Sequence, residues 1–291
     1  MKTAIIFAGQ GSQHPKMGWD YYQNNPEFKA IFDSYPQIRD ICFKSSQINE
    51  TQYAQPAIFL YNYAVSSLLN LEVDYALGLS LGELNALQYA NAFSLESGIA
   101  LVNYRGQIMA DALTDTTAMY AVIKNVEQVA TIISQYQDVY ISNYNSKKQV
   151  IIAGDKESLK TVVAKLKKID CRCIPLKVSG AFHTPYLEKA SLLLNDFVNK
   201  LELKPLKCSV LSNYYGDDNY DLIADNLQKQ LCSAVKFQQE IEFLALNKVE
   251  RIIEIGPKSV IKKLVKDTVD IEVISICSFA DFIKFKENEN E

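Results

Sequence analysis

The sequence predicts an α/β protein in which a small α+β domain interrupts a larger domain built on a mainly parallel sheet. Strand-like and helical segments alternate along the first part of the chain, which is typical of parallel sheets with crossover helices. In the middle the order changes to βαββαβ over about sixty residues, the ferredoxin-like split unit. The first pattern then returns, so we interpret the middle unit as an insertion.

The first part of the large domain begins with a strand that runs directly into the glycine-rich turn GQGSQ. Pro56 is expected to open the second helix, because proline suits the first helical turn. The expected elements are a strand at Thr3–Ala8, helices at 26–35 and 56–70, a strand at Val73–Leu77, a helix that ends near Asn91 and a helix at 95–113.

The small domain is expected at 117–178, between the two parts of the large domain at 1–116 and 179–291. Clefts between domains often bind ligands. The expected strands of the small domain are Met119–Ile123, Val139–Tyr144, Gln149–Gly154 and Cys171–Val178, its helices are Val126–Tyr136 and Glu157–Lys168, and the large domain continues with strands at Cys208–Ser212 and Arg251–Ile255.

Composition limits the classes of function. The chain has 291 residues, of which 48% are hydrophobic and 22% charged, an ordinary globular mixture. Its net charge of −4 argues against nucleic-acid binding. No apolar run approaches the ~20 residues of a membrane helix, and the start MKTAIIFAGQG lacks the length and cleavage region of a signal peptide. We therefore expect a cytoplasmic protein that does not bind a membrane.

Cysteines and lysines each form one local cluster. Cys171 and Cys173 are close in sequence, but no second pair completes a zinc site, so buried free thiols and no metal are expected. The segment from Lys147 to Lys177 contains nine Lys or Arg and three Asp or Glu. Such a cluster is usually a solvated helix face, and the alternative is a surface for an anionic partner.

Gly78-Leu79-Ser80-Leu81-Gly82 matches the G-x-S-x-G pattern of a nucleophile elbow, with a strand expected before it and a helix after it. Small neighbours let the backbone bend there and lift the serine hydroxyl out of the sheet. The amide of Leu81 lies at the helix start, where unpaired N–H groups can bind a developing oxyanion. An ordinary strand–helix turn also fits the pattern, but its context favours a serine nucleophile.

A serine nucleophile needs a base, and the chain has only two histidines. His14 lies in a polar loop beside a proline and is expected at the surface. His183 follows the last strand of the small domain and is the candidate base. An ordinary α/β hydrolase has an acid between its serine and a late histidine. No such acid stands out, and a long segment follows His183, which argues against lipases and esterases.

Arg105 borders an apolar stripe on the helix at 95–113, so its guanidinium is expected to point into the protein. A buried guanidinium is costly without an anion, and a substrate carboxylate can supply one through a bidentate pair. The alternatives are an arginine whose head reaches solvent or a structural ion pair, which are the usual roles of a helical arginine.

Seven short motifs are spread over nearly the whole chain: Phe7–Gln13 (FAGQGSQ), Gln55-Pro56, Gly78–Glu83 (GLSLGE), Arg105-Gly106-x-x-Met109, Asn143-x-Asn145, Gly180–His183 (GAFH) and Glu254–Pro257 (EIGP). In this order they resemble the malonyl-CoA:acyl-carrier-protein transacylases of fatty-acid synthesis and the discrete acyltransferases of polyketide synthesis. The resemblance implies a hydrolase-like domain with a ferredoxin-like insert, which agrees with the order of elements.

The resemblance also implies roles for the matching positions. Ser80 would be acylated, and His183 would act as general base and then as general acid. The remaining positions would surround this pair: Gln10 and the Leu81 amide as the oxyanion hole, Arg105 on the substrate carboxylate, Gln55, Met109 and Phe182 in the acyl pocket, and the Gln230 backbone carbonyl orienting the histidine. The implied substrates are malonyl-CoA and an acyl carrier protein, without a cofactor.

The chain departs from the family pattern at a few positions. Leu79 replaces the histidine that is most common after the first glycine of the elbow, Thr117-Ala118 replace a glycine pair, and Lys147-Lys148 replace Pro-Gly. None removes a catalytic group. The basic stretch around Lys147 and Lys148 is proposed as a docking surface for an acidic carrier protein. The GAFH motif resembles discrete polyketide acyltransferases and malonyl-selective domains more than domains for bulky extender units, which favours polyketide or hybrid-peptide synthesis as the pathway served.

Two other functions compete with malonyl transfer. An editing hydrolase of the same fold would release acyl groups to water, but it has no need of a carboxylate-binding arginine such as Arg105. A non-catalytic protein that docks on a synthase has no need of an intact serine and histidine, and both Ser80 and His183 are present.

Overall fold

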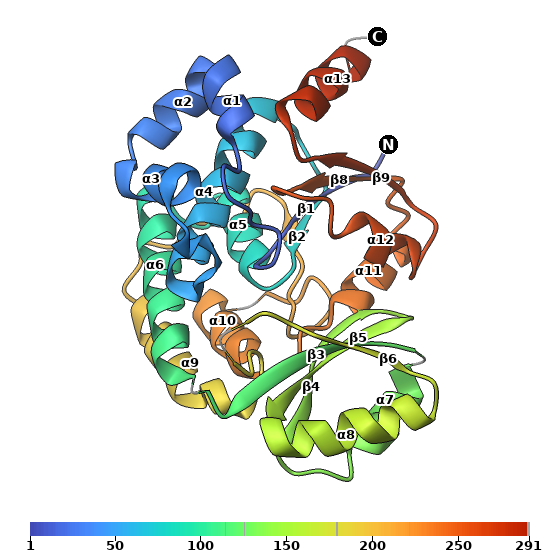
Figure 1. The fold of residues 1–291 in the computed structure, drawn as a ribbon. Coiled ribbons are helices and arrows are strands. Elements are labelled where there is room, and N and C mark those ends of the chain that lie inside the picture. Colours follow the sequence, from blue (N-terminus) through green and yellow to red (C-terminus); the bar gives the residue numbers. More distant parts are fainter. Residues whose placement is uncertain (114, 125, 179, 221, 290–291) are drawn as a thin grey trace.

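The structure, a computed structural model, describes residues 1–113, 115–124, 126–178, 180–220 and 222–289. Figure 1 shows a large part with helices around a sheet and a small part with a sheet and two helices beside it. Residue 179, where the second part of the large domain was expected to begin, lies outside the described residues. The domain limits at 116 and 178 therefore stay a prediction.

The large part is built on a five-stranded sheet in which every paired neighbour is parallel, as predicted. Its strand order is β7 (Ser209–Val210), β2 (Tyr75–Gly78), β1 (Thr3–Phe7), β8 (Arg251–Ile255) and β9 (Glu272–Ile276). Side chains alternate along β1, so Ile5 and Phe7 join one apolar layer while Ala4 and Ile6 join the other. Both faces of the sheet are thus covered, as parallel sheets require.

Helices from separate parts of the chain cover the two faces (Figure 1). Buried side chains of the first layer come from α4 (Thr51–Leu69), α5 (Leu81–Tyr89) and α6 (Leu95–Ala112), and those of the second from α11 (Phe237–Leu246) and α12 (Lys262–Lys266). The other helices are α1 (Trp19–Asn24), α2 (Pro26–Asp33), α3 (Pro36–Lys44), α9 (Glu188–Val198), α10 (Ile223–Cys232) and α13 (Phe279–Glu289), with 3₁₀ turns at Gln47–Asn49 and Pro185–Leu187.

The small part is an antiparallel sheet in the order β4 (Val139–Ser146), β5 (Gln149–Asp155), β3 (Thr117–Ile123) and β6 (Arg172–Pro175). The helices α7 (Val126–Ile133) and α8 (Lys156–Lys168) share an apolar core with one face of this sheet. Alternate residues on the other face, such as Met119 and Ile151, belong to the core of the large part. The predicted fold class, an α/β domain with a ferredoxin-like insert, is confirmed.

Backbone hydrogen bonds also join the two parts. The amide of Tyr144 on β4 donates to the carbonyl of Val235 at 2.8 Å, and the amide of Val235 donates to the carbonyl of Ser142 at 2.9 Å. This contact holds β4 against the segment that precedes α11. The small sheet can therefore form one wall of a site in the large part.

The helix expected to open at Pro56 instead begins at Thr51 and contains the proline in its interior. An interior proline lacks the N–H that would bond the carbonyl four residues earlier, here that of Gln52. The first turn is nevertheless closed by the amide of Ala54, which donates to the Glu50 carbonyl at 2.8 Å, and it packs closely against α6. A Cβ at Gly106 of α6 would lie 3.0 Å from the Gln52 Cα. Packing between helices therefore overrides the local preference of the proline.

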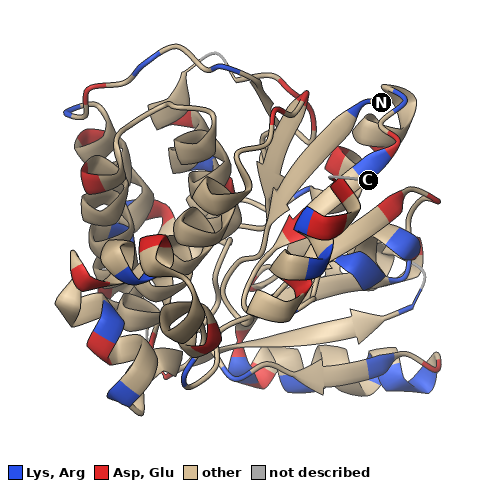
Figure 2. Ribbon diagram, turned by 90° about the horizontal axis from the view of Figure 1, so that it is seen from above, with Lys and Arg blue, Asp and Glu red and all other residues tan. Residues whose placement is uncertain are grey.

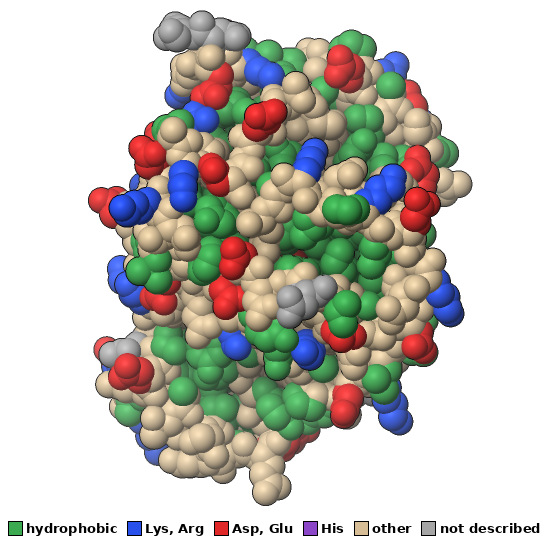
Figure 3. Space-filling view, turned by 180° about the vertical axis from the view of Figure 1, so that it is seen from behind, with side chains coloured by type: hydrophobic (Ala, Val, Ile, Leu, Met, Phe, Trp, Pro, Cys, Tyr) green, Lys and Arg blue, Asp and Glu red, His purple; other side chains and the backbone are tan. Residues whose placement is uncertain are grey.

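The surface seen from behind carries mixed charges, with hydrophobic side chains gathered between them near the middle of the face (Figure 3). None of the described helices combines the length and the hydropathy that crossing a bilayer requires.

Candidate active site

Ser80 lies in a tight turn between the end of β2 and the first residue of α5, with φ 56° and ψ −101°. The turn brings three backbone segments into close contact. A Cβ at Gly82 would lie 2.0 Å from the carbonyl oxygen of Phe7, and one at Gly78 would lie 2.1 Å from the carbonyl carbon of Gly82. Both positions therefore require glycine, which explains the spacing of the G-x-S-x-G motif.

Two side chains bind the backbone of Ser80. The Ser80 N–H donates to Oδ1 of Asn213 at 2.7 Å, and the Ser80 carbonyl accepts from Nε2 of Gln230 at 2.8 Å. A non-glycine residue with a strained backbone costs about 1–3 kcal/mol and persists only where its surroundings fix it. Asn213 could not be predicted from the sequence, because a single asparagine after a short strand belongs to no periodic pattern.

Ser80 and His183 are brought together from positions on opposite sides of the inserted domain. Oγ of Ser80 lies 2.7 Å from Nε2 of His183, and Nδ1 of the same ring lies 2.8 Å from the backbone carbonyl oxygen of Gln230. A carbonyl oxygen only accepts hydrogen bonds, so Nδ1 carries the ring proton and Nε2 presents its lone pair to Ser80. The arrangement gives a serine with a neutral base and an uncharged orienting group.

Burial keeps His183 in this neutral form. The side chain is only 5% exposed, and burial together with the nearby positive charge of Arg105 lowers the pKa of His183 to about 4. The hydrogen bond to the Gln230 carbonyl acts in the opposite direction and raises this pKa. The imidazole is consequently an unprotonated base over the whole neutral range.

The guanidinium of Arg105 is buried directly beside Ser80. Nη1 donates to Oε1 of Gln55 at 2.8 Å, and Nη2 donates to Oγ of Ser80 at 3.2 Å and to Oε1 of Gln230 at 3.1 Å. Gln55 is fixed in turn by a contact of its Nε2 with Sδ of Met109 at 3.2 Å. These residues come from α4, α6 and α10, so three helices hold the cation against the nucleophile.

Arg105 has no carboxylate partner within ion-pair distance in the described part of the chain, and its Nε has no hydrogen-bond partner there. Burial lowers its pKa to about 10, while the more distant Glu83 carboxylate opposes that shift. The side chain therefore stays charged at neutral pH while surrounded by neutral groups. A cation in this setting can bind an anionic substrate group.

A cavity of about 160 Å³ opens over Ser80 between the large part and the small sheet. Its wall combines Ser80 and His183 with side chains from both parts: Gln10, Leu79, Met109, Met119, Asn143, Asn145, Ile151, Leu176, Val178 and Phe182. Arg105 and Gln55 are buried and are not among these lining residues, and Arg105 reaches Oγ of Ser80 through Nη2. Leu81 is the first residue of α5, so its amide has no carbonyl partner earlier in the helix.

A buried carboxyl group, Glu83, contacts Gln230, the residue whose backbone carbonyl faces His183. It accepts from the Tyr220 hydroxyl at 2.6 Å, from Nε2 of Gln230 at 2.8 Å and from the Asn213 amide at 3.3 Å. Burial raises the pKa of Glu83 to about 7, although these hydrogen bonds and Arg105 act to lower it. Glu83 belongs to the GLSLGE motif, but its neighbours are distant in sequence and could not be predicted.

The other candidates from the sequence lie elsewhere. His14 contacts the carbonyl oxygens of Pro15 at 3.0 Å and Pro257 at 3.2 Å and has no contact with Ser80. All six cysteines are free, and no group of metal-ligating residues occurs within the described ranges. Nζ of Lys147 contacts the Thr268 carbonyl at 2.9 Å, and Lys148 pairs with Asp267 at 3.0 Å.

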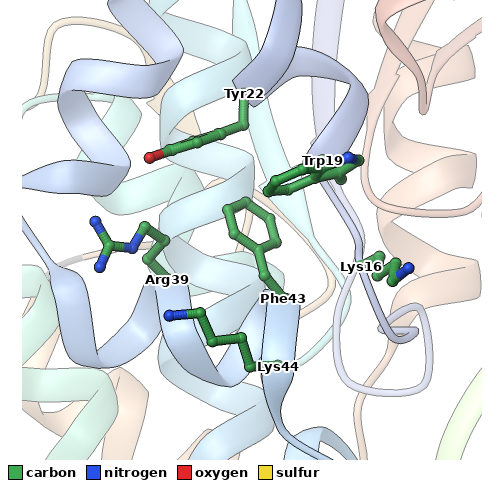
Figure 4. A pocket seen from close by; sticks show the side chains of 6 residues that line it. All are labelled: Lys16, Trp19, Tyr22, Arg39, Phe43 and Lys44. Atoms are coloured by element: carbon green, nitrogen blue, oxygen red, sulfur yellow. The ribbon is translucent and has the colours of Figure 1, made fainter.

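A larger open hollow of about 410 Å³ lies on α1 and α3, where the aromatic rings of Trp19, Tyr22 and Phe43 are framed by Lys16, Arg39 and Lys44 (Figure 4). It shares no lining residue with the cavity over Ser80. Arg39 pairs with Asp33 at the end of α2 and with Asp40 on its own helix α3, and Lys44 also pairs with Asp40. Of these two hollows, only the one over Ser80 has both a candidate nucleophile and a candidate base in its lining.

Comparison with known proteins gives a family for this geometry. The acyl transferase domain family matches residues 4–284. The chain belongs to the acyl transferase family. A malonyl CoA-acyl carrier protein transacylase of Staphylococcus aureus is 31% identical over 306 residues, which cover 99% of this chain and 99% of the relative. The predicted resemblance to the malonyl-CoA:acyl-carrier-protein transacylases is thereby confirmed.

Solved structures of acyl transferases have the same fold. The malonyl CoA-acyl carrier protein transacylase of Clostridium perfringens superposes with a TM-score of 0.94 at 31% identity, over 100% of this chain and 98% of that one. A malonyl-transacylase in complex with its type II polyketide synthase acyl-carrier protein gives a TM-score of 0.93 at 26% identity, over 99% and 100% of the two chains. The polyketide biosynthesis protein PksE of Bacillus subtilis is 32% identical over 277 residues, which are 89% of this chain and 36% of PksE.

Proposed function

We propose that this acyl transferase moves malonyl from malonyl-CoA to the phosphopantetheine thiol of an acyl carrier protein through an ester on Ser80. The observation that carries the proposal is the position of Arg105, a buried cation without an acid partner in the described chain, 3.2 Å from Oγ of Ser80. An acyl group on that oxygen would bring a terminal carboxylate into reach of the guanidinium.

In the first half-reaction, Nε2 of His183 accepts the proton of the Ser80 hydroxyl as Oγ attacks the thioester carbonyl. The C–S bond then breaks, and the coenzyme A thiolate leaves with the proton that His183 held. In the second half-reaction, the carrier thiol gives its proton to His183 while the sulfur of that thiol attacks the seryl ester. The C–Oγ bond breaks, and His183 returns its proton to Ser80.

Both tetrahedral intermediates place a negative charge on the former carbonyl oxygen. Leu81, at the start of α5, presents a backbone N–H without a helical partner, and Gln10 lines the same cavity. We assign the oxyanion hole to these two residues, because donors aimed at the developing charge stabilise the transition state more than the ground state. The reaction exchanges one thioester for another, so this chemistry needs no cofactor or metal.

The acyl pocket is assigned to Arg105 with its supports Gln55 and Met109, and to Phe182 in the cavity wall. A bidentate pair between guanidinium and carboxylate fixes both the charge and the orientation of malonyl. An editing hydrolase gains nothing from this cation, and a non-catalytic docking protein gains nothing from a paired serine and histidine.

The carrier protein is proposed to dock on the basic surface of the small domain near Lys147 and Lys148. Exposed lysines continue along α8, while over most of the molecule the ribbon of Figure 2 shows Lys and Arg positions interspersed with Asp and Glu positions. The coenzyme is phosphorylated and carrier proteins of this pathway type are typically acidic, so a positive patch near the cavity favours both partners. We propose service to a polyketide or fatty-acid synthase in the cytoplasm, where the six free thiols are compatible with reducing conditions.

One experiment separates the three functions. The protein is incubated with malonyl-CoA labelled in the malonyl group and with a phosphopantetheinylated carrier protein. Label on the carrier supports malonyl transfer, and free labelled malonate with an unlabelled carrier supports an editing hydrolase. Intact malonyl-CoA would overturn both enzymatic proposals and leave a docking protein.

A further inference from the structure

Asn213 lies behind the nucleophile and not in the cavity. It follows β7 and is fully buried. Its Oδ1 accepts the Ser80 N–H at 2.7 Å, and its Nδ2 donates to the Gly78 carbonyl at 2.8 Å and to the two carboxyl oxygens of Glu240 at 3.1 and 3.0 Å. One amide group therefore ties both ends of the elbow to helix α11.

These contacts define how the Asn213 amide is oriented. The Ser80 N–H can only donate and the Gly78 carbonyl can only accept, so the oxygen must face Ser80 and the nitrogen must face Gly78. A flipped amide would place two donors and two acceptors against each other, and each buried unsatisfied group costs about 1–3 kcal/mol. Glu240 provides a second acceptor for Nδ2 and reinforces the same orientation.

The backbone of Asn213 is held as firmly as its side chain. Its carbonyl accepts from the Lys236 amide at 2.7 Å, and its own amide donates to Glu83 at 3.3 Å. Asn213 thus joins α11, the elbow and the buried Glu83 in a single network. The sequence separation between Asn213 and Ser80 is 133 residues, so the contact exists only in the folded chain.

The two neighbouring N–H groups of the turn differ in their partners. The N–H of Ser80 is bound by Asn213, whereas the N–H of Leu81, the first residue of α5, has no partner within the helix. A turn that released the Ser80 N–H would rotate both peptide groups and move Oγ relative to Nε2 of His183. Misplacement of a reacting atom by about 1 Å can reduce a rate by about a hundredfold. The hydrogen bond from Ser80 to Asn213 therefore acts on the geometry of both the nucleophile and the oxyanion hole.

We propose that Asn213, kept in orientation by Glu240, is a positioning residue that holds the strained nucleophile turn in its reactive geometry. The inference rests on the proposed acylation of Ser80, and it adds a residue that touches neither substrate nor reacting atoms. Because burial and the nearby Glu83 raise the pKa of Glu240 well above its usual range, Gln is a close substitute for its neutral form. Leu has a similar volume but no acceptor.

The test compares four variants of the full chain with the wild type in single-turnover acylation by malonyl-CoA, far below each variant's melting temperature. Asn213→Ala is expected to slow acylation about a hundredfold with KM changed by less than about threefold. Glu240→Leu is expected to slow it about tenfold, and Glu240→Gln to restore it to within about threefold of wild type. The matched control is Glu254→Gln, which alters another fully buried glutamate that binds the amides of Val260 and Ile261. It should lower the melting temperature and leave the acylation rate unchanged.

The outcomes separate this inference from the proposed function. If the wild type forms no malonyl ester, the proposed function fails. If the wild type is acylated and folded Asn213→Ala is acylated equally fast, the function stands and the positioning role is wrong. Equal rate losses in Glu240→Leu and Glu254→Gln would mean that general destabilisation explains the effect, and that result would also overturn the inference. Should Asn213→Ala not fold, the comparison of Glu240→Leu with Glu240→Gln decides the question alone.

Discussion

Nε2 of His183 lies 2.7 Å from Oγ of Ser80 while Nδ1 of the same ring faces the Gln230 carbonyl oxygen at 2.8 Å. A carboxylate in the place of this carbonyl would stabilise the imidazolium and raise the pKa of the base. The neutral carbonyl fixes the tautomer and orientation without adding charge. This suits a site that already contains the Arg105 cation, and it explains why no acid between Ser80 and His183 stood out in the sequence.

The first prediction concerns the catalytic pair. Wild-type protein incubated with malonyl-CoA alone should gain the mass of one malonyl group, located on Ser80 by peptide mapping, and Ser80→Ala should gain none. His183→Ala should slow both half-reactions by about 10²–10⁴-fold, because one base serves both attacks. A malonyl adduct that persists in Ser80→Ala would show that another residue is the nucleophile.

The second prediction is a pH profile. Because burial and Arg105 lower the pKa of His183 to about 4, the base remains unprotonated well below the ordinary histidine range. The rate of Ser80 acylation should therefore stay level as the pH falls from 7 to about 5 and then decrease around pH 4. Stopped-flow measurement of kcat/KM for malonyl-CoA tests this. A midpoint near 6.5, the ordinary value, would mean that the base is solvated.

The third prediction concerns stability and Glu83. Burial raises its pKa to about 7 from 4.5, so between these values the folded chain binds a proton that the unfolded chain has lost. Stability from this group is fully present below pH 4.5 and is lost as the pH rises towards 7, a loss of about 3 kcal/mol for an isolated group. His183 acts in the opposite direction, because its lowered pKa makes stability decrease as the pH falls from 6.5 to 4.

The measurement is urea unfolding at intervals from pH 4.5 to 7.5 for wild type and Glu83→Gln. The variant has no proton to lose, so its free energy of unfolding should increase with pH relative to wild type, whatever its absolute stability. Parallel curves for the two proteins would show that Glu83 titrates normally in the folded state.

The sequence pointed to the side chains that the fold brings together at the elbow, but not to the groups that hold them there. Ser80 and His183 could be found because a glycine pattern marks one and the scarcity of histidine marks the other. Arg105 could be found from helical spacing. Asn213 and Glu240 could not be found in this way, because the hydrogen bonds that link them to Ser80 form only where distant segments meet in the fold.

The fold shows the same division between local and distant information. The strand at Arg251–Ile255 and the βαββαβ order of the insert follow from local patterns, and both are present. The start of α4 does not follow from a local pattern. Pro56 suggests that the helix begins there, but packing against Gly106 extends the helix back to Thr51. Edge strand β9 was also missed, since its pairing with β8 is made only after the intervening helix folds back.

The fourth prediction concerns the carrier surface. Reversal of charge in Lys147→Glu/Lys148→Glu should reduce kcat/KM for the carrier roughly tenfold at low salt and much less at high salt, because the loss lies in association rate. Turnover with malonyl-CoA in the first half-reaction should change less. A charge-matched control is Lys200→Glu/Lys204→Glu, which alters two exposed lysines of the large part.

Both lysines of the proposed docking surface also make intramolecular ion pairs, Lys148 with Asp267 at 3.0 Å and Lys147 with Glu242 at 3.8 Å. Asp267→Asn removes the ion pair between Lys148 and the large part but retains the lysine. It therefore distinguishes a role of Lys148 in carrier docking from a role in holding the small part against the large part. If Asp267→Asn impairs the carrier reaction as strongly as the reversal does, the lysines act within the molecule. Unchanged carrier kinetics in the reversal at low salt would make the patch an ordinary solvated face.

The last prediction tests the identity of the acyl group. If Arg105 binds the free carboxylate of malonyl, Arg105→Ala should reduce kcat/KM for malonyl-CoA by a factor equivalent to about 2–5 kcal/mol, which includes the cost of an unpaired buried carboxylate. Acetyl-CoA is the same thioester without that charge and gains nothing from the pair. The variant should therefore prefer acetyl-CoA, which reverses the preference expected of the wild type.

The comparison must be a ratio of substrates, because Arg105 also donates to Ser80, Gln55 and Gln230. Loss of these bonds disturbs the nucleophile equally for both thioesters and cancels in the ratio, whereas loss of the carboxylate pair affects malonyl alone. Arg105→Lys retains the charge without the planar pair of donors, so it should fall between wild type and Arg105→Ala in malonyl preference. Equal losses for malonyl-CoA and acetyl-CoA in Arg105→Ala would make the arginine a support of Ser80, and the choice of malonyl would then depend on other residues of the cavity.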